Sequence, residues 1–396
     1  MLNSTRILSR RQPSTSKIVI SIDEEKKYLF FIGFPCFTFN TFAPLILSAS
    51  STKVTAVISD TYGKDYSHVP ISGVEVPIVT MAEFYSISKH AAVEVVQFFE
   101  RRDDLWSFVA LKSSGINVKI VDFIEKLAEL KLHHTYRAVN EERDWWLSQP
   151  LERVQRMSDM LGDQRSKDVL AARISAYVNL DRNSLMENSM SMHYEYFNNI
   201  DGQQSFTPSD CEWYVDVGAA HGDTIDKFIS VVNGKFSRID AFEPTPGQYV
   251  ELEKRAFKDH RIHTYQSAVG GITGEIKFFD DLKNPFGGNA VSIDDGQMTI
   301  DVKCVRLDDV INKCTLLKMD VEGFECRVLE GARQLIRTNK PNMAVTCYHY
   351  PNDLFDILEL VADIHSYRYV ALRHYGATLY DSILYFSDTQ SFGSQR

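Results

Sequence analysis

The stretch WYVDVGAAHGDT, from Trp213 to Thr224, decides the fold of this chain. Its first half is an apolar strand that ends in an acid and a glycine, and its second half is a turn of small residues. A helix with Asp223 as its N-cap is expected next, because four apolar residues repeat at helical spacing: Ile225, Phe228, Ile229 and Val232. Small side chains let the backbone turn tightly against a ligand, and a helix start offers free N–H groups. The stretch predicts a ligand-binding strand–turn–helix unit.

A second strand, Arg238–Phe242, ends in the carboxylate of Glu243, and Pro244 follows it directly. In doubly wound sheets an acid at this strand end accepts hydrogen bonds from ribose hydroxyls, so both NAD and S-adenosylmethionine would suit it. The NAD pattern G-x-G-x-x-G is broken, because Ala220 stands at its second glycine. Asp216, placed before the first glycine, indicates a ligand with a positive charge nearby. The amino group of a methionine moiety supplies such a charge, so S-adenosylmethionine is favoured.

These motifs, with Ser267-Ala268-Val269-Gly270 and the run Leu317–Glu325, resemble the FkbM family of S-adenosylmethionine-dependent methyltransferases over about residues 206–390. The resemblance implies an α/β class I methyltransferase: a Rossmann-like doubly wound sheet of seven strands, the last antiparallel. Apolar segments place the strands at 213–218, 238–243, 262–268, 316–321, 343–348, 367–373 and 382–386. Two extra strands are expected at 275–279 and 298–305. The glycine-rich loop 284–289 between them is either a lid over the site or a plain connection.

The resemblance also implies the residues that bind the cofactor. The turn after the first strand would hold the methionine end, Glu243 the ribose, and the end of the third strand the adenine. The full set is Asp216, Gly218, Ala219, Gly222, Asp223, Glu243, Ser267 and Ala268.

The candidate catalytic residues are Asp320, Glu322 and His349, at the ends of the fourth and fifth strands. A hydroxyl is a poor nucleophile unless a base takes its proton during attack, and Asp320 is the first candidate for that base. His349 is the second, because imidazole accepts a proton near neutral pH. Asp320 could instead cap the next helix, and His349 could be a hydrogen-bonded core residue. The three could also form an oxygen/nitrogen metal site, but no spacing demands one, so no metal is expected.

Residues 373–375, Arg-His-Tyr, follow the sixth strand and could line the acceptor pocket by position alone.

The first half of the chain predicts a second, smaller α/β domain. Residues 28–52 carry no charge, but glycine and proline interrupt the run, so it favours a strand (28–34), a turn and a helix (41–49) over a membrane span. Further strands are expected at 54–59, 74–79, 106–111 and 118–121, with a helix over 81–99. The turn after the first strand lacks the paired glycines that close on a pyrophosphate. This domain is expected to be Rossmann-like without a nucleotide site, with a structural or docking role.

Residues 136–197 are polar and repeat apolar positions at helical spacing, which predicts one or two helices bridging the halves. The predicted organisation is therefore an N-terminal α/β domain (1–135), a helical bridge (136–205) and a methyltransferase domain (206–396).

Composition limits the partners of this 396-residue chain. It has a formal charge of −10, of which residues 206–396 carry −8, so a nucleic-acid partner is not expected. The six cysteines form no metal-binding or disulfide pattern, which favours free thiols and a cytoplasmic protein.

Together the patterns predict an S-adenosylmethionine-dependent O-methyltransferase that acts on a hydroxyl of a saccharide or secondary metabolite. The expected partner is thus a small-molecule or glycan acceptor. Two alternatives remain: a non-catalytic binding or scaffold protein that keeps the fold, and an NAD-dependent oxidoreductase, which the glycine pattern disfavours.

Overall fold

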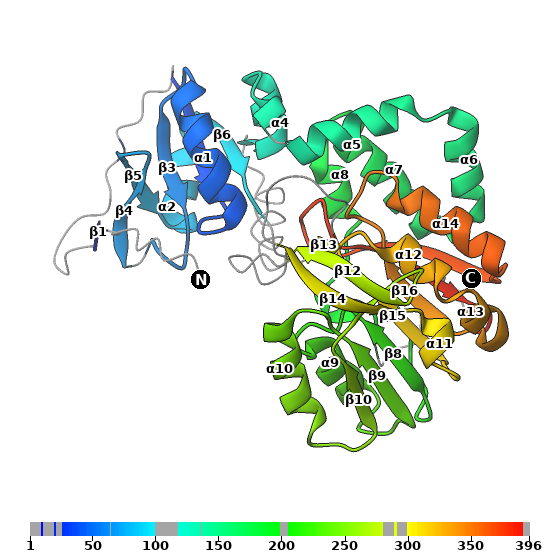
Figure 1. The fold of residues 1–396 in the computed structure, drawn as a ribbon. Coiled ribbons are helices and arrows are strands. Elements are labelled where there is room, and N and C mark those ends of the chain that lie inside the picture. The colour runs from blue at the N-terminus through cyan, green and yellow to red at the C-terminus, as the bar shows by residue number, and fades with distance from the viewer. Residues whose placement is uncertain are drawn as a thin grey trace. The chain divides into compact units, whose positions relative to one another are not determined.

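The computed structural model describes residues 9–10, 20, 26–63, 65–99, 118–135, 137–198, 205–279, 289–290 and 299–390. The chain divides into two compact units. Unit 1 consists of residues 1–143, 172–187 and 376–378, and unit 2 of residues 144–171, 188–375 and 379–396. Figure 1 shows the elements of both in chain order by colour.

Unit 1 contains a seven-stranded sheet in the order β1-β4-β5-β3-β2-β6-β7. The five strands from β5 to β7 are parallel, and β1 and β4 add an antiparallel edge. The strands are β1 (Ser9–Arg10), β2 (Lys27–Ile32), β3 (Val54–Ile58), β4 (Tyr66–Ile71), β5 (Val74–Val79), β6 (Ala92–Gln97) and β7 (Val118–Asp122). The helices α1 (Phe37–Ala49), α2 (Met81–Ser88), α4 (Phe123–Glu129) and α8 (Arg182–Glu187), and the short η1 (His133–Thr135), complete it.

The uncharged run 28–52 folds as predicted, into β2, α1 and the turn before β3. Its apolar side chains enter the core of unit 1, where Phe30 and Phe31 are fully buried. Among the described residues, no helix is long and apolar enough to cross a membrane.

The ends of strands β2 and β6 lie close together in unit 1. The strand order reverses between β2 and β6, which is where doubly wound sheets open a crevice. At Gly33, after β2, an added Cβ would lie 2.9 Å from the carbonyl carbon of Phe98, and the Cys36 thiol donates to the Phe98 carbonyl oxygen at 3.0 Å. The ring of Phe98 packs edge-on against Phe31 and Phe39. The parallel strands and the reversal of their order agree with the predicted Rossmann-like unit.

The helix predicted over 81–99 is wrong in its second half. Helix α2 ends at Ser88, and strand β6 follows it between β2 and β7. Val93, Val95 and Val96 are buried in this strand, and β-branched residues favour the extended backbone of a central parallel strand. The strand predicted at 106–111 lies outside the described residues.

The segment predicted as a bridge contains more helices than expected, and it is shared between the two units. In addition to α8 it forms α5 (Arg137–Ser148), α6 (Leu151–Met160), α7 (Gln164–Val178) and the short η2 (Met192–Tyr194). Residues 144–171 belong to unit 2 and 172–187 to unit 1, so the unit boundaries fall within α5 and α7 rather than at 135 and 205.

Unit 2 contains a second seven-stranded sheet, in the order β10-β9-β8-β15-β16-β18-β17. All neighbours are parallel except β18, which is antiparallel to both β16 and β17, so the predicted sheet is confirmed. The strands are β8 (Trp213–Val217), β9 (Arg238–Phe242), β10 (Ile262–Tyr265), β15 (Leu316–Met319), β16 (Asn342–Thr346), β17 (Tyr369–His374) and β18 (Ser382–Ser387). The helices, besides α6, are α9 (Asp223–Val231), α10 (Pro246–Ala256), α11 (Leu307–Val310), α12 (Glu325–Glu330), α13 (Arg333–Asn339) and α14 (Asp353–Ile364).

A smaller sheet interrupts the chain between β10 and β15. Its strands lie in the order β11-β14-β12-β13 and are β11 (Ala268–Val269), β12 (Gly274–Phe279), β13 (Asn289–Ala290) and β14 (Thr299–Val305). The two predicted extra strands correspond to β12 and β14. The strand predicted at 262–268 ends earlier, at Tyr265, because Ala268 pairs with Cys304 in this second sheet. Residues 284–288 of the predicted glycine-rich loop 284–289 lie outside the described residues, so its role as a lid or a plain connection stays a prediction.

Candidate functional site

The turn after β8 packs closely against the end of the neighbouring strand β15. Gly218 has a φ of +77°, and a Cβ at this position would overlap the carbonyl oxygen of Asp320. Only glycine tolerates both conditions, because an L side chain is strained at positive φ. The predicted cofactor turn and the backbone of Asp320, a predicted catalytic residue, therefore lie next to each other.

Helix α9 begins with an open N-terminus. Gly222 is its N-cap, at a φ of +85°, and no side chain caps the helix. Asp223 was predicted to be the N-cap, but it is the first helical residue. The first N–H groups of the helix therefore have no side-chain acceptor, and the helix dipole favours an anionic group at this end.

Asp216 is fully buried and already has a cationic partner. Lys318 Nζ lies 3.1 Å from Asp216 Oδ1 and donates to the carbonyl oxygen of Gly218 at 2.7 Å. Burial raises the pKa of Asp216. Burial alone would lower the pKa of Lys318, but the Asp216 carboxylate that faces it raises the pKa of Lys318 above its ordinary value. Lys318 thus places a positive charge next to Asp216, and through Lys318 this carboxylate is linked to the backbone of the turn.

Glu243 lies at the end of β9, as predicted. Its carboxylate accepts hydrogen bonds that hold the turn in place. Its Oε2 accepts the Ala220 N–H at 3.0 Å, and its Oε1 accepts the Thr245 N–H at 2.8 Å. Each carboxylate oxygen can accept more than one hydrogen bond, so acceptor capacity remains for a ribose hydroxyl.

The other predicted cofactor residues lie around these groups. Ala219, in the turn, is fully buried. Ser267 and Ala268 are also buried and follow β10, whose last residue, Tyr265, stacks on Phe242 at 4.5 Å.

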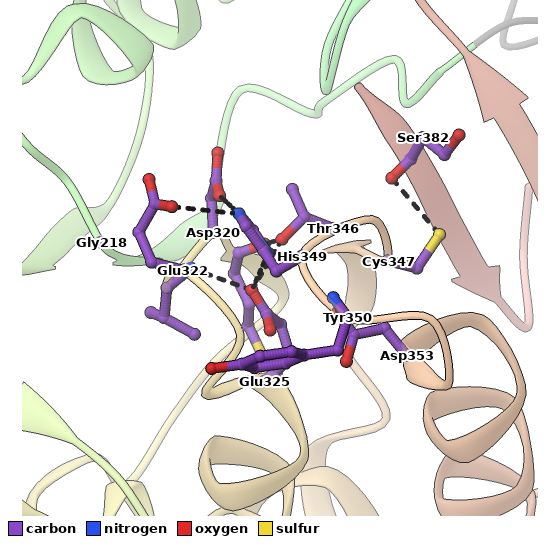
Figure 2. Close-up of polar contacts among 12 residues, drawn as sticks. Gly218, Asp320, Glu322, Glu325, Thr346, Cys347, His349, Tyr350, Asp353 and Ser382 are labelled. Atoms are coloured by element: carbon purple, nitrogen blue, oxygen red, sulfur yellow. Dashed lines mark hydrogen bonds and ion pairs between the residues drawn. The ribbon is translucent and has the colours of Figure 1, made fainter. Parts of the chain in front are cut away.

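The three predicted catalytic residues meet in one cluster, together with Glu325 (Figure 2). His349 Nε2 lies 3.6 Å from Asp320 Oδ1 and 3.5 Å from Glu322 Oε2. The other ring nitrogen, Nδ1, lies 3.1 Å from Glu325 Oε1. The His349 side chain is 9% exposed and that of Glu325 only 1%, whereas Glu322 is 39% exposed. The cluster therefore has a closed side, formed by Glu325, and an open side, formed by Glu322.

Glu325 is held rigidly within this cluster. The same oxygen that faces His349 accepts the Val321 N–H at 3.1 Å and the Thr346 hydroxyl at 2.9 Å. Glu322 reaches the cluster from a turn in which it has a φ of +54° and Gly323 a φ of +94°. A left-handed backbone costs a non-glycine residue about 1–2 kcal/mol. The turn that brings the Glu322 carboxylate into the cluster is therefore strained at Glu322.

The electrostatics of the cluster follow from its three carboxylates. Burial alone would lower the pKa of His349, but Glu325, Asp320 and Glu322 outweigh it and raise this pKa to about 9. Burial raises the pKa of Glu322 to about 7. Burial alone would raise the pKa of Glu325. The nearby His349 ring and the hydrogen bonds to this carboxylate outweigh burial, so the pKa of Glu325 is lowered.

Tyr196 was not predicted from the sequence, although it contacts the cluster. Its hydroxyl donates to Asp320 Oδ2 at 2.9 Å, and its backbone N–H donates to the Tyr385 hydroxyl at 3.0 Å. Burial raises the pKa of the Tyr196 phenol well above its ordinary value, so it remains a donor. Tyr196 comes from the segment assigned to the bridge, and no motif marks it.

The residues Arg373, His374 and Tyr375 do not line a pocket. All three are fully buried, and each has a partner inside unit 2. Arg373 pairs with Asp163 at 3.2 Å, His374 Nδ1 lies 2.9 Å from the Ser382 hydroxyl, and the Tyr375 hydroxyl lies 2.7 Å from that of Tyr385. These side chains are part of the core.

The strand order, the antiparallel β18 and the turn between β8 and α9 define a class I methyltransferase with a Rossmann-like fold. Residues 216–371 match the family model of the methyltransferase FkbM domain, which confirms the predicted resemblance over this part of the chain.

One solved structure supports the same fold. The methyltransferase FkbM from Methylobacillus flagellatus KT is 22% identical and has a TM-score of 0.62, covering 91% of this chain and 89% of its own. Fibrillarin from Aeropyrum pernix, solved with natively bound S-adenosyl-L-methionine, is 10% identical over 47% of this chain and 71% of its own. Its TM-score of 0.31 is too low to bear on the fold. No curated protein matches the chain.

Proposed function

We propose that unit 2 binds S-adenosylmethionine and transfers its methyl group to a hydroxyl of a saccharide or secondary metabolite. The observation that carries this proposal is the contact between the turn after β8 and Asp320. The backbone of Asp320 lies against the turn where the cofactor of this fold binds, and one oxygen of its carboxylate, Oδ1, makes no hydrogen bond.

The residues of the turn fit such a cofactor. The open N-terminus of α9 suits the carboxylate of its methionine end, and Glu243 retains acceptor capacity for its ribose. When bound, S-adenosylmethionine supplies an electrophilic methyl group. Asp216 and Lys318 support the turn from within the sheet, and we assign them no direct contact with the cofactor.

Asp320 is the residue we assign as proton acceptor for the hydroxyl. Tyr196 fixes its Oδ2, whereas its Oδ1 makes no hydrogen bond. His349 is less suited to this role, because both of its ring nitrogens already face carboxylates. We assign His349 to the positioning of Asp320 and Glu322. O-methylation is favoured because a hydroxyl requires this proton removal during methyl transfer.

A methyl-transfer screen tests the proposal directly. The full chain is incubated with S-adenosylmethionine labelled in the methyl group and a panel of saccharide and polyketide hydroxyl acceptors. Calorimetry with S-adenosylhomocysteine measures cofactor binding separately. We expect binding, a labelled product, and a loss of about 100-fold or more in kcat for Asp320→Asn with cofactor affinity unchanged.

The matched control is Glu251→Gln, which removes one exposed carboxylate on α10. It should leave both cofactor affinity and kcat unchanged. Binding of NAD in place of S-adenosylhomocysteine would overturn the proposal, as would an Asp320→Asn variant with full activity.

A further inference from the structure

The cluster around His349 has the form of a metal site. We infer that His349 Nε2, Asp320 Oδ1 and Glu322 Oε2 bind one divalent cation, with Glu325 holding the imidazole from behind. This inference concerns the site of the proposed function, and it rests on that function only for the role of the ion.

Unbonded donor atoms carry the inference. His349 is more than nine-tenths buried, and neither of its ring nitrogens makes a hydrogen bond; Nδ1 has only the close approach to Glu325, and Nε2 faces Asp320 and Glu322. Asp320 Oδ1 is likewise buried and without a hydrogen bond. A buried polar atom without a partner costs about 1–3 kcal/mol, and here two such atoms point toward each other at 3.6 Å. A cation bound by His349 Nε2 and Asp320 Oδ1 would give both atoms a partner.

The geometry on the other side of the ring supports this assignment. His349 Nδ1 lies 3.1 Å from Glu325 Oε1, and that oxygen is fixed by Val321 and Thr346. A histidine that binds a metal through one nitrogen usually donates its other N–H to such a carboxylate, which fixes the tautomer and the ring orientation. Glu325 then acts as a positioning residue, and Nε2 is left facing the two remaining carboxylates.

The charges of the cluster also favour a cation. Lys318 is paired with Asp216, so three carboxylates share a single imidazole. Negative charge is thus in excess in a largely buried place, where one further cation would offset it. One nitrogen and two carboxylate oxygens suit Mn²⁺, Zn²⁺ or Fe²⁺ better than Ca²⁺, which prefers oxygen alone.

An ion at this point would bind the acceptor hydroxyl as a further ligand and lower its pKa, with the released proton passing to water. In the ion-loaded protein, this activation replaces proton abstraction by Asp320. The ion would also hold the acceptor oxygen next to the turn that binds the methyl donor.

Ion binding is measured without a methyl donor, so that it is independent of the proposed function. Full-length protein stripped with a chelator is titrated with Mn²⁺, and free Mn²⁺ is followed by electron paramagnetic resonance. We expect one tightly bound ion per chain, and a loss of affinity of about ten-fold or more in His349→Gln and in Glu322→Gln. Zn²⁺ should displace the bound Mn²⁺.

Two variants serve as matched controls. His365→Gln removes a histidine that pairs with Asp388, and Glu251→Gln removes an exposed carboxylate. Both should bind Mn²⁺ like the wild type. Because Glu322 is the most exposed of the three carboxylates, Glu322→Gln should keep the fold, which thermal unfolding verifies.

The inference is overturned if no stoichiometric ion binds, or if Glu322→Gln and His349→Gln bind it as tightly as the controls do. A protein that binds no ion and still methylates its acceptor would refute the ion site and leave the proposed function intact. Binding of Mn²⁺ by a protein that binds no S-adenosylhomocysteine would support the ion site and refute the proposed function.

Discussion

Lys318 and Asp216 lie directly opposite each other on the parallel strands β15 and β8, with Nζ 3.1 Å from Oδ1 and both side chains almost completely buried. Lys318 also donates to the carbonyl oxygen of Gly218. This ion pair links the two central strands of unit 2 to the turn that we propose binds the cofactor.

Removal of the lysine alone should destabilise unit 2 strongly. Lys318→Met leaves the Asp216 carboxylate buried without its partner, so we expect the free energy of unfolding to fall by about 3–5 kcal/mol. The double variant Asp216→Leu with Lys318→Met removes both charges and should recover most of that loss. Urea denaturation of the three proteins measures both effects. A single variant as stable as the wild type would show that the pair is not required.

Two glycines with similar backbones should respond differently to alanine. Gly218 and Gly234 have φ values of +77° and +72°, but a Cβ at Gly218 would overlap Asp320, whereas a Cβ at Gly234 has no neighbour within 4 Å. Gly234→Ala should cost only the left-handed strain of about 1–2 kcal/mol. Gly218→Ala should cost at least about 3 kcal/mol, because the neighbouring backbone must also move. Denaturation midpoints compare the two, and equal losses would contradict the packing described for the turn.

Tyr196 should affect turnover rather than cofactor binding. Tyr196→Phe removes the hydrogen bond that fixes Asp320 Oδ2, and the mispositioned carboxylate should lower kcat by about ten-fold. The affinity for S-adenosylhomocysteine should not change. Tyr367→Phe is the control, because its buried hydroxyl donates instead to the Pro341 carbonyl oxygen, and it should lose stability but no kcat. A weakened cofactor affinity in Tyr196→Phe would reassign this residue to the cofactor site.

Substitution of Glu243 should mainly weaken cofactor binding. Glu243→Ala leaves the N–H groups of Ala220 and Thr245 without their acceptor, so the turn loosens and the ribose loses its partner. We expect calorimetry to show an affinity for S-adenosylhomocysteine lower by about ten-fold or more, since two half-buried donors of the turn lose their acceptor. Asp320→Asn should show the opposite pattern, with cofactor affinity kept and turnover lost. If the two variants exchange these effects, our role assignments are reversed.

The strands of unit 2 were predictable because each has a local signature. A short apolar run such as Trp213–Val217, closed by an acid and small residues, is typical of a parallel strand that ends at a binding turn. The wrong prediction of a helix over the second half of residues 81–99 also has a physical reason. Val93, Val95 and Val96 lie at spacings compatible with a helix or a strand, and the buried position of β6 between two neighbours determines which one forms.

The predicted catalytic residues were chosen from their place at strand ends, and this criterion did not reveal their partners. Lys318 lies within a strand whose other residues are apolar. Tyr196 contacts the Asp320 carboxylate from a position more than 120 residues away in the chain. Neither carries a motif, because a partner in space is specified by packing and not by spacing along the chain.

The amino-acid sequence alone therefore determines the class of sheet, the turn that we propose binds the cofactor and the carboxylates at the strand ends, since these depend on local patterns. The contacts within the site depend on how distant segments pack. Asp216 faces Lys318, and Glu325 and His349 form one cluster with Asp320 and Glu322. Burial and neighbouring charge set what a carboxylate or an imidazole does, and both exist only after the chain has folded.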